Sequence, residues 1–277
     1  MVALSMIVLA GCGSSGGGLS GPTIGAAKTF SLAAFRPAGS VKPGVPTTVT
    51  FHVQQPSGSP LTKYKTGAGP HTGVHLIFVR KDLSAIIHLH PPIRPDGSIS
   101  EKVTFPSPGP WHVLVDVYPN LGANFQRNFQ LTQTIDVAGA YHPHPLPAFT
   151  AADTVGGDRF AMKSPGKIRS LQPEFFDISV RDAAGRPATF TPWFGALAHA
   201  IFFRQGTLDY FHTHVCGPGA TNCTSNLGAA AKVKGTSTTP GKIQIGVLLP
   251  APGTWRMFLQ AKINGTIVTA PYTLKVS

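Results

Sequence analysis

Short apolar segments alternate with turns rich in glycine and proline along most of the chain. Two such segments, 197–204 (LAHAIFFR) and 208–214 (LDYFHTH), are separated by Gln205-Gly206. A glycine in a short polar break between two apolar runs predicts a β-hairpin, because glycine adopts positive φ without steric cost. No segment has the 3.6-residue period of a long amphipathic helix. The pattern therefore predicts an all-β chain.

The same block of sequence occurs twice, and this indicates a tandem duplication. GVHLIFVRKDLSAIIHLHP is matched by LAHAIFFRQGTLDYFHTHV, and each is followed by a similar strand start, FPSPGPW at 105–111 and LPAPGTW at 249–255. An internal repeat constrains the architecture more than any single motif. Each copy carries the pattern His-x12-His-x-His: His75, His88 and His90 in the first, and His199, His212 and His214 in the second.

Each repeat contains about seven candidate strands, the number found in an immunoglobulin-like sandwich. They are 29–33, 47–53, 74–80, 84–90, 99–105, 111–118 and 125–137, then 159–162, 174–181, 197–204, 208–214, 242–248, 255–262 and 266–276. We therefore predict two tandem immunoglobulin-like or cupredoxin-like β-sandwich domains. The expected segments are a signal at 1–11, a Gly/Ser-rich tether at 12–27, repeats at 28–138 and 158–277, and a linker at 139–157.

The hairpin pattern places the histidines of each repeat on one face of a sheet. If Gln205-Gly206 is a two-residue loop, His199 faces His212, and His214 projects from the same side because side chains alternate along a strand. Directly opposite residues have Cβ atoms about 4.5–5.5 Å apart, close enough to share one metal ion.

The first copy gives the same arrangement, with Lys81-Asp82 in the turn and His75 opposite His88. Imidazole-rich sites suit copper, zinc or nickel, so each triad is a candidate site for a transition metal, with copper or zinc as the expected ion. The alternative is a hydrogen-bonded histidine cluster with a structural role.

Asp116 is a carboxylate in the middle of the apolar strand 111–118, where burial is costly unless the group is paired. It is a candidate fourth metal ligand, or an acceptor that orients a ligating histidine. An ordinary hydrogen-bonded strand residue is the alternative. Gln260 takes the corresponding position in the second repeat and is a poor ligand, so the first site is expected to be more complete.

The amino-terminal residues resemble a bacterial lipoprotein signal. Leu9-Ala10-Gly11-Cys12 matches the lipobox, and a flexible GSSGGG segment follows. By this resemblance, cleavage precedes Cys12, which becomes lipid-modified and anchors the protein to a membrane. Residues 1–11 contain no Lys or Arg, in contrast to the basic start of most export signals.

Cys216 and Cys223 enclose a loop rich in small residues, CGPGATNC. An exported chain favours a disulfide between them, which would restrain the segment that follows His214. The competing interpretation is a Cys2His2 zinc site that includes His212 and His214.

The chain is basic, with 23 Lys and Arg against 11 Asp and Glu and a formal net charge of +12. Because these charges are scattered, they indicate either a basic solvated surface or attraction to anionic cell-wall polymers. No basic helix or nucleic-acid motif is present, so a nucleic-acid partner is not expected.

The blocks HLIFVRKDLSAIIHLHP and FPSPGPWHVLVDVYP, with their counterparts in the second half, resemble an uncharacterised family of bacterial secreted proteins and lipoproteins. The resemblance implies a cell-envelope location and a pair of β-sandwiches. Its likeness to cupredoxin-type and YtkA-like export proteins suggests copper or another heavy metal.

Three functions are consistent with these patterns. The first is an envelope lipoprotein that binds copper or zinc as a chaperone, scavenger or resistance factor. The second is a non-catalytic adhesion or cell-wall-binding module with structural histidine clusters. The third is a metal-dependent hydrolase or oxidase, which is less favoured because the sequence has no nucleophile elbow, phosphate loop or cofactor fingerprint.

Overall fold

The computed structural model describes residues 29–277 apart from 68, 123–127, 218–234 and 238–239. These residues form strands joined by turns, without a helix among them, so the all-β prediction is confirmed. The first repeat contains β1 (Ser31–Arg36), β2 (Pro46–Gln54), β3 (Val74–Arg80), β4 (Ile86–Leu89), β5 (Ser98–Thr104), β6 (Gly109–Val117) and β7 (Phe129–Val137). The second contains β8 (Ala152–Val155), β9 (Asp158–Met162), β10 (Glu174–Arg181), β11 (Phe190–Thr191), β12 (Ala198–Arg204), β13 (Tyr210–Cys216), β14 (Gly235–Thr236), β15 (Lys242–Val247), β16 (Gly253–Ile263) and β17 (Thr266–Val276).

The first repeat is a sandwich of two antiparallel sheets, with strand orders β1-β2-β5 and β4-β3-β6-β7. Residues at alternate positions of the two sheets form its core, including Phe51, Phe78, Val113 and Ile135. Seven strands divided in this way form an immunoglobulin-like sandwich. The fold class predicted from the sequence is therefore confirmed.

The second repeat has the same two strand orders, β9-β10-β15 and β13-β12-β16-β17. Its separate core includes Phe160, Ile178, Trp255 and Tyr272. Three strands were not predicted, namely β8, β11 and β14. β11 and β14 are only 2 residues long, too short for a visible alternation of apolar and polar positions. β14 pairs with both β13 and β15 and so joins the two layers into one continuous sheet.

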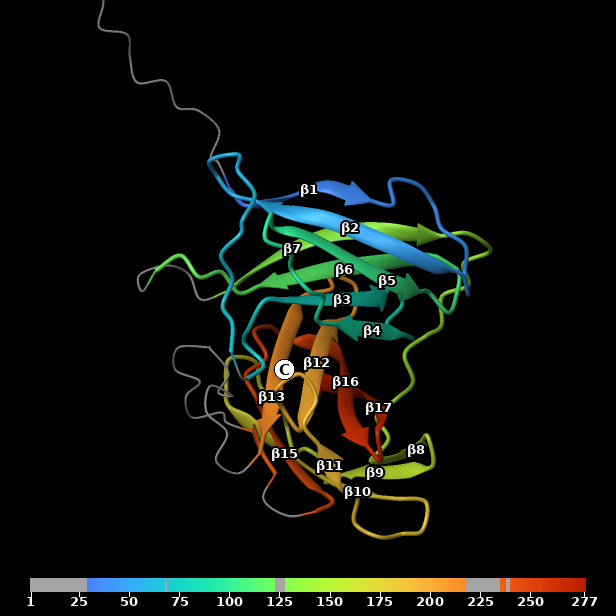
Figure 1. The fold of residues 1–277 in the computed structure, drawn as a ribbon. Coiled ribbons are helices and arrows are strands. Elements are labelled where there is room, and N and C mark those ends of the chain that lie inside the picture. The colour runs from blue at the N-terminus through green and yellow to red at the C-terminus, as the bar shows by residue number, and fades with distance from the viewer. Residues whose placement is uncertain (1–28, 68, 123–127, 218–234, 238–239) are drawn as a thin grey trace, which may run out of the picture.

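The two repeats pack against each other through the sheets that contain β3 and β12 (Figure 1). Every residue of β3 is buried, because Leu76 and Phe78 face the core of the first repeat while Ile77 and Val79 face the second repeat. A third apolar cluster fills this interface: Ile77, Val79, Leu83, Leu114, Ile201, Phe203 and Phe258. Burying each such side chain contributes about 1.5–3 kcal/mol. The same face of β3 carries His75, so the interface also receives the histidines.

The hairpins that carry the histidines have longer loops than predicted. The backbone N–H of Arg80 donates to the carbonyl of Ala85 at 3.0 Å, so four residues form the first loop. Within it the carboxylate of Asp82 accepts hydrogen bonds from the N–H and hydroxyl of Ser84. A side chain that bonds the backbone two residues ahead favours this type of turn. The second hairpin has the same loop length, with Arg204 N–H donating to the carbonyl of Asp209 at 2.9 Å.

The longer loops change the register of both hairpins by two residues. His199 pairs with His214 rather than with His212, and His88 pairs with Ile77 rather than with His75. The predicted pairs were therefore wrong. A shift of two residues preserves the alternation of faces, whereas a shift of one would reverse it. The histidines consequently stay on the predicted face.

The segment between the repeats has little regular structure. β8 lies within the range 139–157 that the sequence assigns to a linker, and it pairs with β9. Before it, the backbone N–H of His144 donates to the carboxylate of Asp82 at 2.9 Å. The side chains of His142 and His144 are exposed. Within the described residues, no helix has the length and hydrophobicity needed to cross a membrane.

Candidate metal centre

The six histidines of the two sequence triads meet in one cluster between the repeats. Each repeat contributes them from equivalent places: His75 on β3, His88 on β4 and His90 just after it, and His199 on β12 with His212 and His214 on β13. Four are buried, with exposures of 0% for His75 and His199, 4% for His88 and 2% for His214. Burial at this level removes the imidazoles from water, so their nitrogens depend on partners within the protein.

The ring contacts cross the boundary between the repeats. The ring centroids of His88 and His199 lie 5.1 Å apart, as do those of His75 and His212, and His88 lies 5.3 Å from His212. The sequence predicted one separate site per repeat. The structure instead has a single cluster, because the face of each hairpin that carries histidines is turned toward the other repeat.

Three groups of three histidines have ligand nitrogens within 4.8 Å of one another and could hold a metal ion. One is the first sequence triad, and the other two combine residues of both repeats. The second sequence triad does not form such a group among the described residues. The groups are His75, His88 and His90; His75, His212 and His214; and His88, His199 and His212.

Backbone carbonyl groups fix the tautomers of His75 and His199. The Nε2–H of His75 donates to the carbonyl of Pro70 at 2.6 Å, and that of His199 donates to the carbonyl of Trp193 at 2.9 Å. A carbonyl oxygen only accepts, so the proton is on Nε2 and each Nδ1 keeps its lone pair. Such a hydrogen bond is the usual way in which a protein orients a ligating histidine.

Gln260 orients His88 in the same way. The Nδ1–H of His88 donates to Oε1 of Gln260 at 3.2 Å, while the amide nitrogen of Gln260 donates to the hydroxyl of Thr269 at 3.1 Å. The Nε2 atom of His88 therefore carries the lone pair and lies 3.1 Å from Nε2 of His90. The sequence marked Gln260 as a poor ligand. In the structure it holds a histidine of the other repeat.

His212 presents each of its nitrogens to a different histidine. Its Nδ1 lies 3.3 Å from Nδ1 of His75, and its Nε2 lies 3.3 Å from Nδ1 of His199. A neutral imidazole has one N–H and can donate to only one of them. In a metal-free neutral cluster, the other contact therefore brings two lone pairs together.

Burial lowers the pKa of all six histidines, and the positive charges of their neighbours would lower it further. The pKa is lowered to about 3 for His75 and for His199, mainly by desolvation, although the backbone hydrogen bonds to Pro70 and Trp193 oppose the shift. The pKa values of the other four, His88, His90, His212 and His214, are also lowered, with desolvation as the largest cause. The imidazoles are consequently neutral at pH 7, which is the form that binds metals.

Asp116 lies beside the cluster but in none of the three groups. Its buried carboxylate accepts hydrogen bonds from four side chains at 2.8–3.3 Å: Tyr118, Asn128, Gln130 and Tyr210. Burial raises its pKa, whereas these four hydrogen bonds oppose the increase. No hydrogen bond joins Asp116 to a histidine in the described residues. Asp116 is the partner of His75 in the pairing of β6 with β3, and the ring of Tyr118 lies 5.0 Å from the ring of His75.

Loops that precede β3 and β12 supply residues that the sequence did not single out. The ring of His71 lies 4.7 Å from that of His214, and Phe194 stacks on His90 with centroids 3.8 Å apart and planes 8° apart. Each repeat therefore covers histidines of the other. Both residues lie just upstream of the first histidine of a triad, but nothing in that position alone predicts a contact with the opposite repeat.

The predicted roles of the cysteines fall mainly outside the described residues. Cys216 is the last residue of β13 and is 1% exposed. It belongs to none of the three groups found among the described residues, and the Cys2His2 alternative also requires Cys223. Cys12 and Cys223 both lie outside the described part of the chain. Lipid modification of Cys12 and a disulfide between Cys216 and Cys223 therefore stay predictions.

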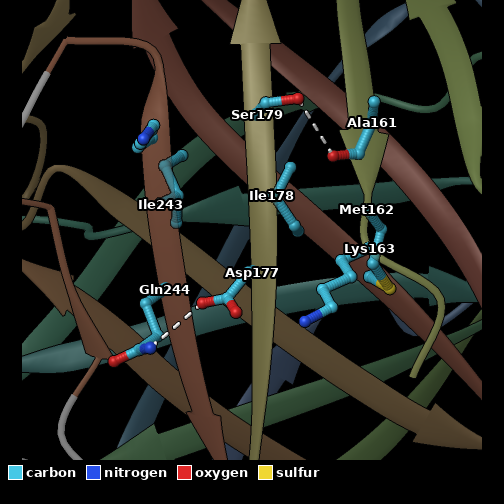
Figure 2. A pocket seen from close by; sticks show the side chains of 9 residues that line it. Ala161, Met162, Lys163, Asp177, Ile178, Ser179, Ile243 and Gln244 are labelled. Carbon is cyan, nitrogen blue, oxygen red and sulfur yellow. Dashed lines mark hydrogen bonds between the residues drawn. The ribbon is translucent and has the colours of Figure 1, made fainter. Parts of the chain in front are cut away.

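A hollow on the second repeat is a weaker candidate than the histidine cluster. It lies over β9, β10 and β15, and Figure 2 shows Asp177, Ser179 and Gln244 among its lining residues. The amide of Gln244 donates to the carboxylate of Asp177 at 3.0 Å, and the hydroxyl of Ser179 donates to the carbonyl of Ala161 at 3.4 Å. These polar groups are partnered and lie on the open side of the sheet, so they lack the desolvation that marks a reactive or ligating site.

A family model described as a domain of unknown function (DUF8832) matches residues 29–135 and 153–277. The chain belongs to this family. The two matched segments correspond to the two β-sandwiches, in agreement with the internal repeat. Membership of the DUF8832 family assigns no activity, and no curated protein matches the chain.

Solved structures with a similar fold have low sequence identity. Fibronectin(III)-like modules of Clostridium thermocellum CbhA match with 9% identity and a TM-score of 0.22, covering 90% of this chain and 93% of theirs. Domains 4 and 5 of the S-layer protein SbsC match with 12% identity and a TM-score of 0.22, covering 89% and 98%. A Salmonella alpha-2-macroglobulin mutant matches with 12% identity and a TM-score of 0.25, and the alignment covers 90% of this chain but only 15% of that one. Because the family has no assigned function, the function of this chain is inferred from its own site.

Proposed function

We propose that this protein binds a transition metal, copper or zinc, in the histidine cluster between its repeats. We further propose that it acts in the cell envelope as a metal chaperone, scavenger or resistance factor. The observation that carries the proposal is that each neutral imidazole has only one N–H, whereas His212 has two histidine contacts and His214 has no hydrogen-bond partner among the described residues. A metal-free cluster of neutral imidazoles cannot satisfy all of their nitrogens.

His214 supports this argument because neither of its buried ring nitrogens has a hydrogen-bond partner among the described residues. A neutral imidazole must carry one N–H, and leaving a buried donor unsatisfied costs about 1–3 kcal/mol. His212 is a second unfavourable case, because one of its two contacts, with His75 or with His199, brings two nitrogen lone pairs together. Protonation of His212 would remove that contact, but burial lowers its pKa well below the usual range. A metal ion would accept lone pairs from His212, His214 and their neighbours, which removes the contact between two lone pairs and gives one ring nitrogen of His214 a partner.

The distances between the nitrogens also suit coordination. Nitrogen atoms of different imidazoles lie 3.1 Å apart in one contact and 3.3 Å apart in two others. Ligands held at ~2.0–2.1 Å around a tetrahedral zinc ion lie roughly 3.4 Å apart. Small rotations of the rings would therefore be sufficient to complete a site. Imidazole nitrogen is a good ligand for Zn(II) and Cu(II).

A binding role is favoured over a catalytic one because the ligands are shielded. A catalytic metal keeps an open coordination position for water or substrate. His75 and His199 are 0% exposed, and Phe194 stacks directly on His90. His90 and His212 are only partly buried, and His88 and His214 are buried like His75 and His199. The proposed envelope location rests on the lipobox at Cys12 and on the family resemblance.

The alternative function is adhesion or cell-wall binding, with the histidines serving only to hold the repeats together. The apolar interface around Ile77 and Phe203 is consistent with a rigid two-domain module. This alternative predicts that the protein takes up no metal. It also predicts that replacing the histidines affects stability alone.

The two functions can be separated by measuring metal binding to the full chain without a purification tag. Chelator-stripped protein would be titrated with Zn(II) and with Cu(II), and the metal retained after gel filtration would be measured. The test variant is His88→Gln/His90→Gln. Its matched control is His142→Gln/His144→Gln, which removes an exposed pair with the same His-x-His spacing.

We expect the wild type and the control to retain metal equally and the test variant to retain less. The proposal is overturned if the wild type retains no metal, or if only the variant of the exposed pair loses it. Circular dichroism of each variant, with melting curves, would show whether a loss of metal reflects unfolding. Metal binding by the folded test variant at the wild-type level would also contradict the proposal.

A further inference from the structure

We propose that the cluster holds two metal ions and that the imidazole ring of His212 lies between them as a shared ligand. This inference rests on the proposed function and specifies the architecture of its site. The observation behind it is that the two nitrogens of His212 contact histidines of different groups. A histidine that serves one ion would need only one nitrogen directed into the cluster.

The first ion would be held by His75, His212 and His214, which form one of the three groups. The Nδ1 atom of His75 is available because its Nε2–H is bonded to the carbonyl of Pro70. It faces Nδ1 of His212 at 3.3 Å. His214 completes this set with a buried ring whose nitrogens have no hydrogen-bond partner in the described structure.

The second ion would be held by His88, His199 and His212. The Nδ1 atom of His199 is available because its Nε2–H is bonded to the carbonyl of Trp193, and it faces Nε2 of His212 at 3.3 Å. His88 offers Nε2, since its Nδ1–H is bonded to Gln260. The Nε2 atom of His90 lies 3.1 Å from that atom and could provide a fourth ligand.

These two groups are compatible because they share only His212, which gives a different nitrogen to each. The remaining group, with His75, His88 and His90, would use the one available nitrogen of both His75 and His88. An ion bound by this third group would therefore remove His75 from the first site and His88 from the second. The arrangement that uses the most histidines is the pair of ions on either side of His212.

Coordination of both nitrogens changes the protonation of His212. A neutral imidazole carries one N–H, so binding of the second ion must release that proton to solvent and leave an imidazolate. The negative charge of the imidazolate reduces the repulsion between the two cations. An imidazolate also separates the ions by roughly 6 Å, given metal–nitrogen bonds of ~2.0–2.1 Å.

Copper(II) provides a direct test, because two Cu(II) ions joined by an imidazolate couple antiferromagnetically. Stripped full-length protein would be titrated with Cu(II), with stoichiometry measured by native mass spectrometry and unpaired spins measured by electron paramagnetic resonance. We expect two copper ions per chain and less than half of one spin per copper at low temperature. One copper at saturation, or two coppers with a full spin each, would overturn the shared ligand. Absence of any bound copper and zinc would instead overturn the proposed function.

Variants give a second test that does not depend on one substitution. In His214→Gln the second group is intact, so we expect one copper with a full spin. In His212→Gln any copper that remains should also show a full spin, because the connecting ring is gone. The control His142→Gln/His144→Gln should behave as the wild type. If folded His212→Gln binds two coppers and still shows less than half of one spin per copper, His212 is not the bridge. If this variant does not fold, the spin intensity of the wild type tests the bridge.

Discussion

The Nδ1 atom of His75 lies 3.3 Å from the Nδ1 atom of His212, although the two residues are 137 positions apart and belong to different repeats. The Nε2–H of His75 is already bonded to a backbone carbonyl, so this contact can be a hydrogen bond only if His212 donates from Nδ1. His212 then has no proton for His199. The duplication has therefore produced a composite centre whose integrity depends on how the repeats pack.

Gly195 should be essential to the packing of the loops around the cluster. A Cβ atom at this position would lie 2.4 Å from the backbone carbon of Gly69, next to Pro70, whose carbonyl accepts from His75. Gly195→Ala should weaken metal binding as well as stability, as measured by competition titration and thermal melting. Gly185→Ala is the control, since Gly185 has a similar φ of +77° but nothing within 4 Å. Both variants incur about 1–2 kcal/mol of backbone strain, and equal metal affinities for the two would contradict the prediction.

Gln260 should tune the metal affinity without being a ligand. Gln260→Met removes the acceptor that orients His88, and loss of such an orienting partner typically lowers metal affinity about 10–100-fold. Gln260→Glu keeps an oxygen acceptor at the same place and should retain more of the affinity. Competition with a zinc-selective chelator would measure both. If Met and Glu have the same effect, the hydrogen bond to His88 does not orient the ligand.

Phe203 and Phe202 provide a matched pair for testing the interface, because both are 0% exposed and they face opposite sides of β12. Phe203 packs between the repeats, whereas Phe202 packs inside the second repeat. Replacing either with Ala should destabilise the protein by about 3–5 kcal/mol. Only Phe203→Ala should also lower the metal affinity, because it loosens the packing of one repeat on the other. Denaturant unfolding and metal titration at a temperature where both variants are folded would show the difference.

The metal-free protein should lose stability in acid. The pKa values of His75 and His199 are lowered from 6.5 to about 3 in the folded state, so the unfolded chain binds more protons between these values. The free energy of unfolding should therefore be constant above about pH 6.5 and decrease as the pH falls toward 3. Denaturant unfolding with chelator present, between pH 7 and pH 4, would measure the slope.

The matched comparison for this pH effect is His75→Gln, which should show a shallower slope than the wild type. His142→Gln serves as the control, because the side chain of His142 is exposed. A slope unchanged by His75→Gln would mean that other groups cause the acid sensitivity.

The amino-acid sequence by itself determined most of the strands and the face on which the histidines lie. The ranges 74–80, 174–181 and 266–276 were predicted with the bounds that the structure gives to β3, β10 and β17. These assignments depend on the two-residue alternation of side chains along a strand, which is a local property. The register of the hairpins was wrong by two residues, because the bonds from Asp82 to Ser84 favour a four-residue loop.

Only the tertiary structure decided which histidines come together. Sequence spacing grouped His199, His212 and His214, whereas the fold groups His212 and His214 with His75, and groups His199 and His212 with His88. Spacing reports neighbours within one hairpin, but the packing of two sheets depends on the shapes of both surfaces and on contacts distant in sequence. The apolar residues of that interface are indistinguishable in sequence from those of the sandwich cores. For this reason two separate triads in the sequence become one shared centre in the folded protein.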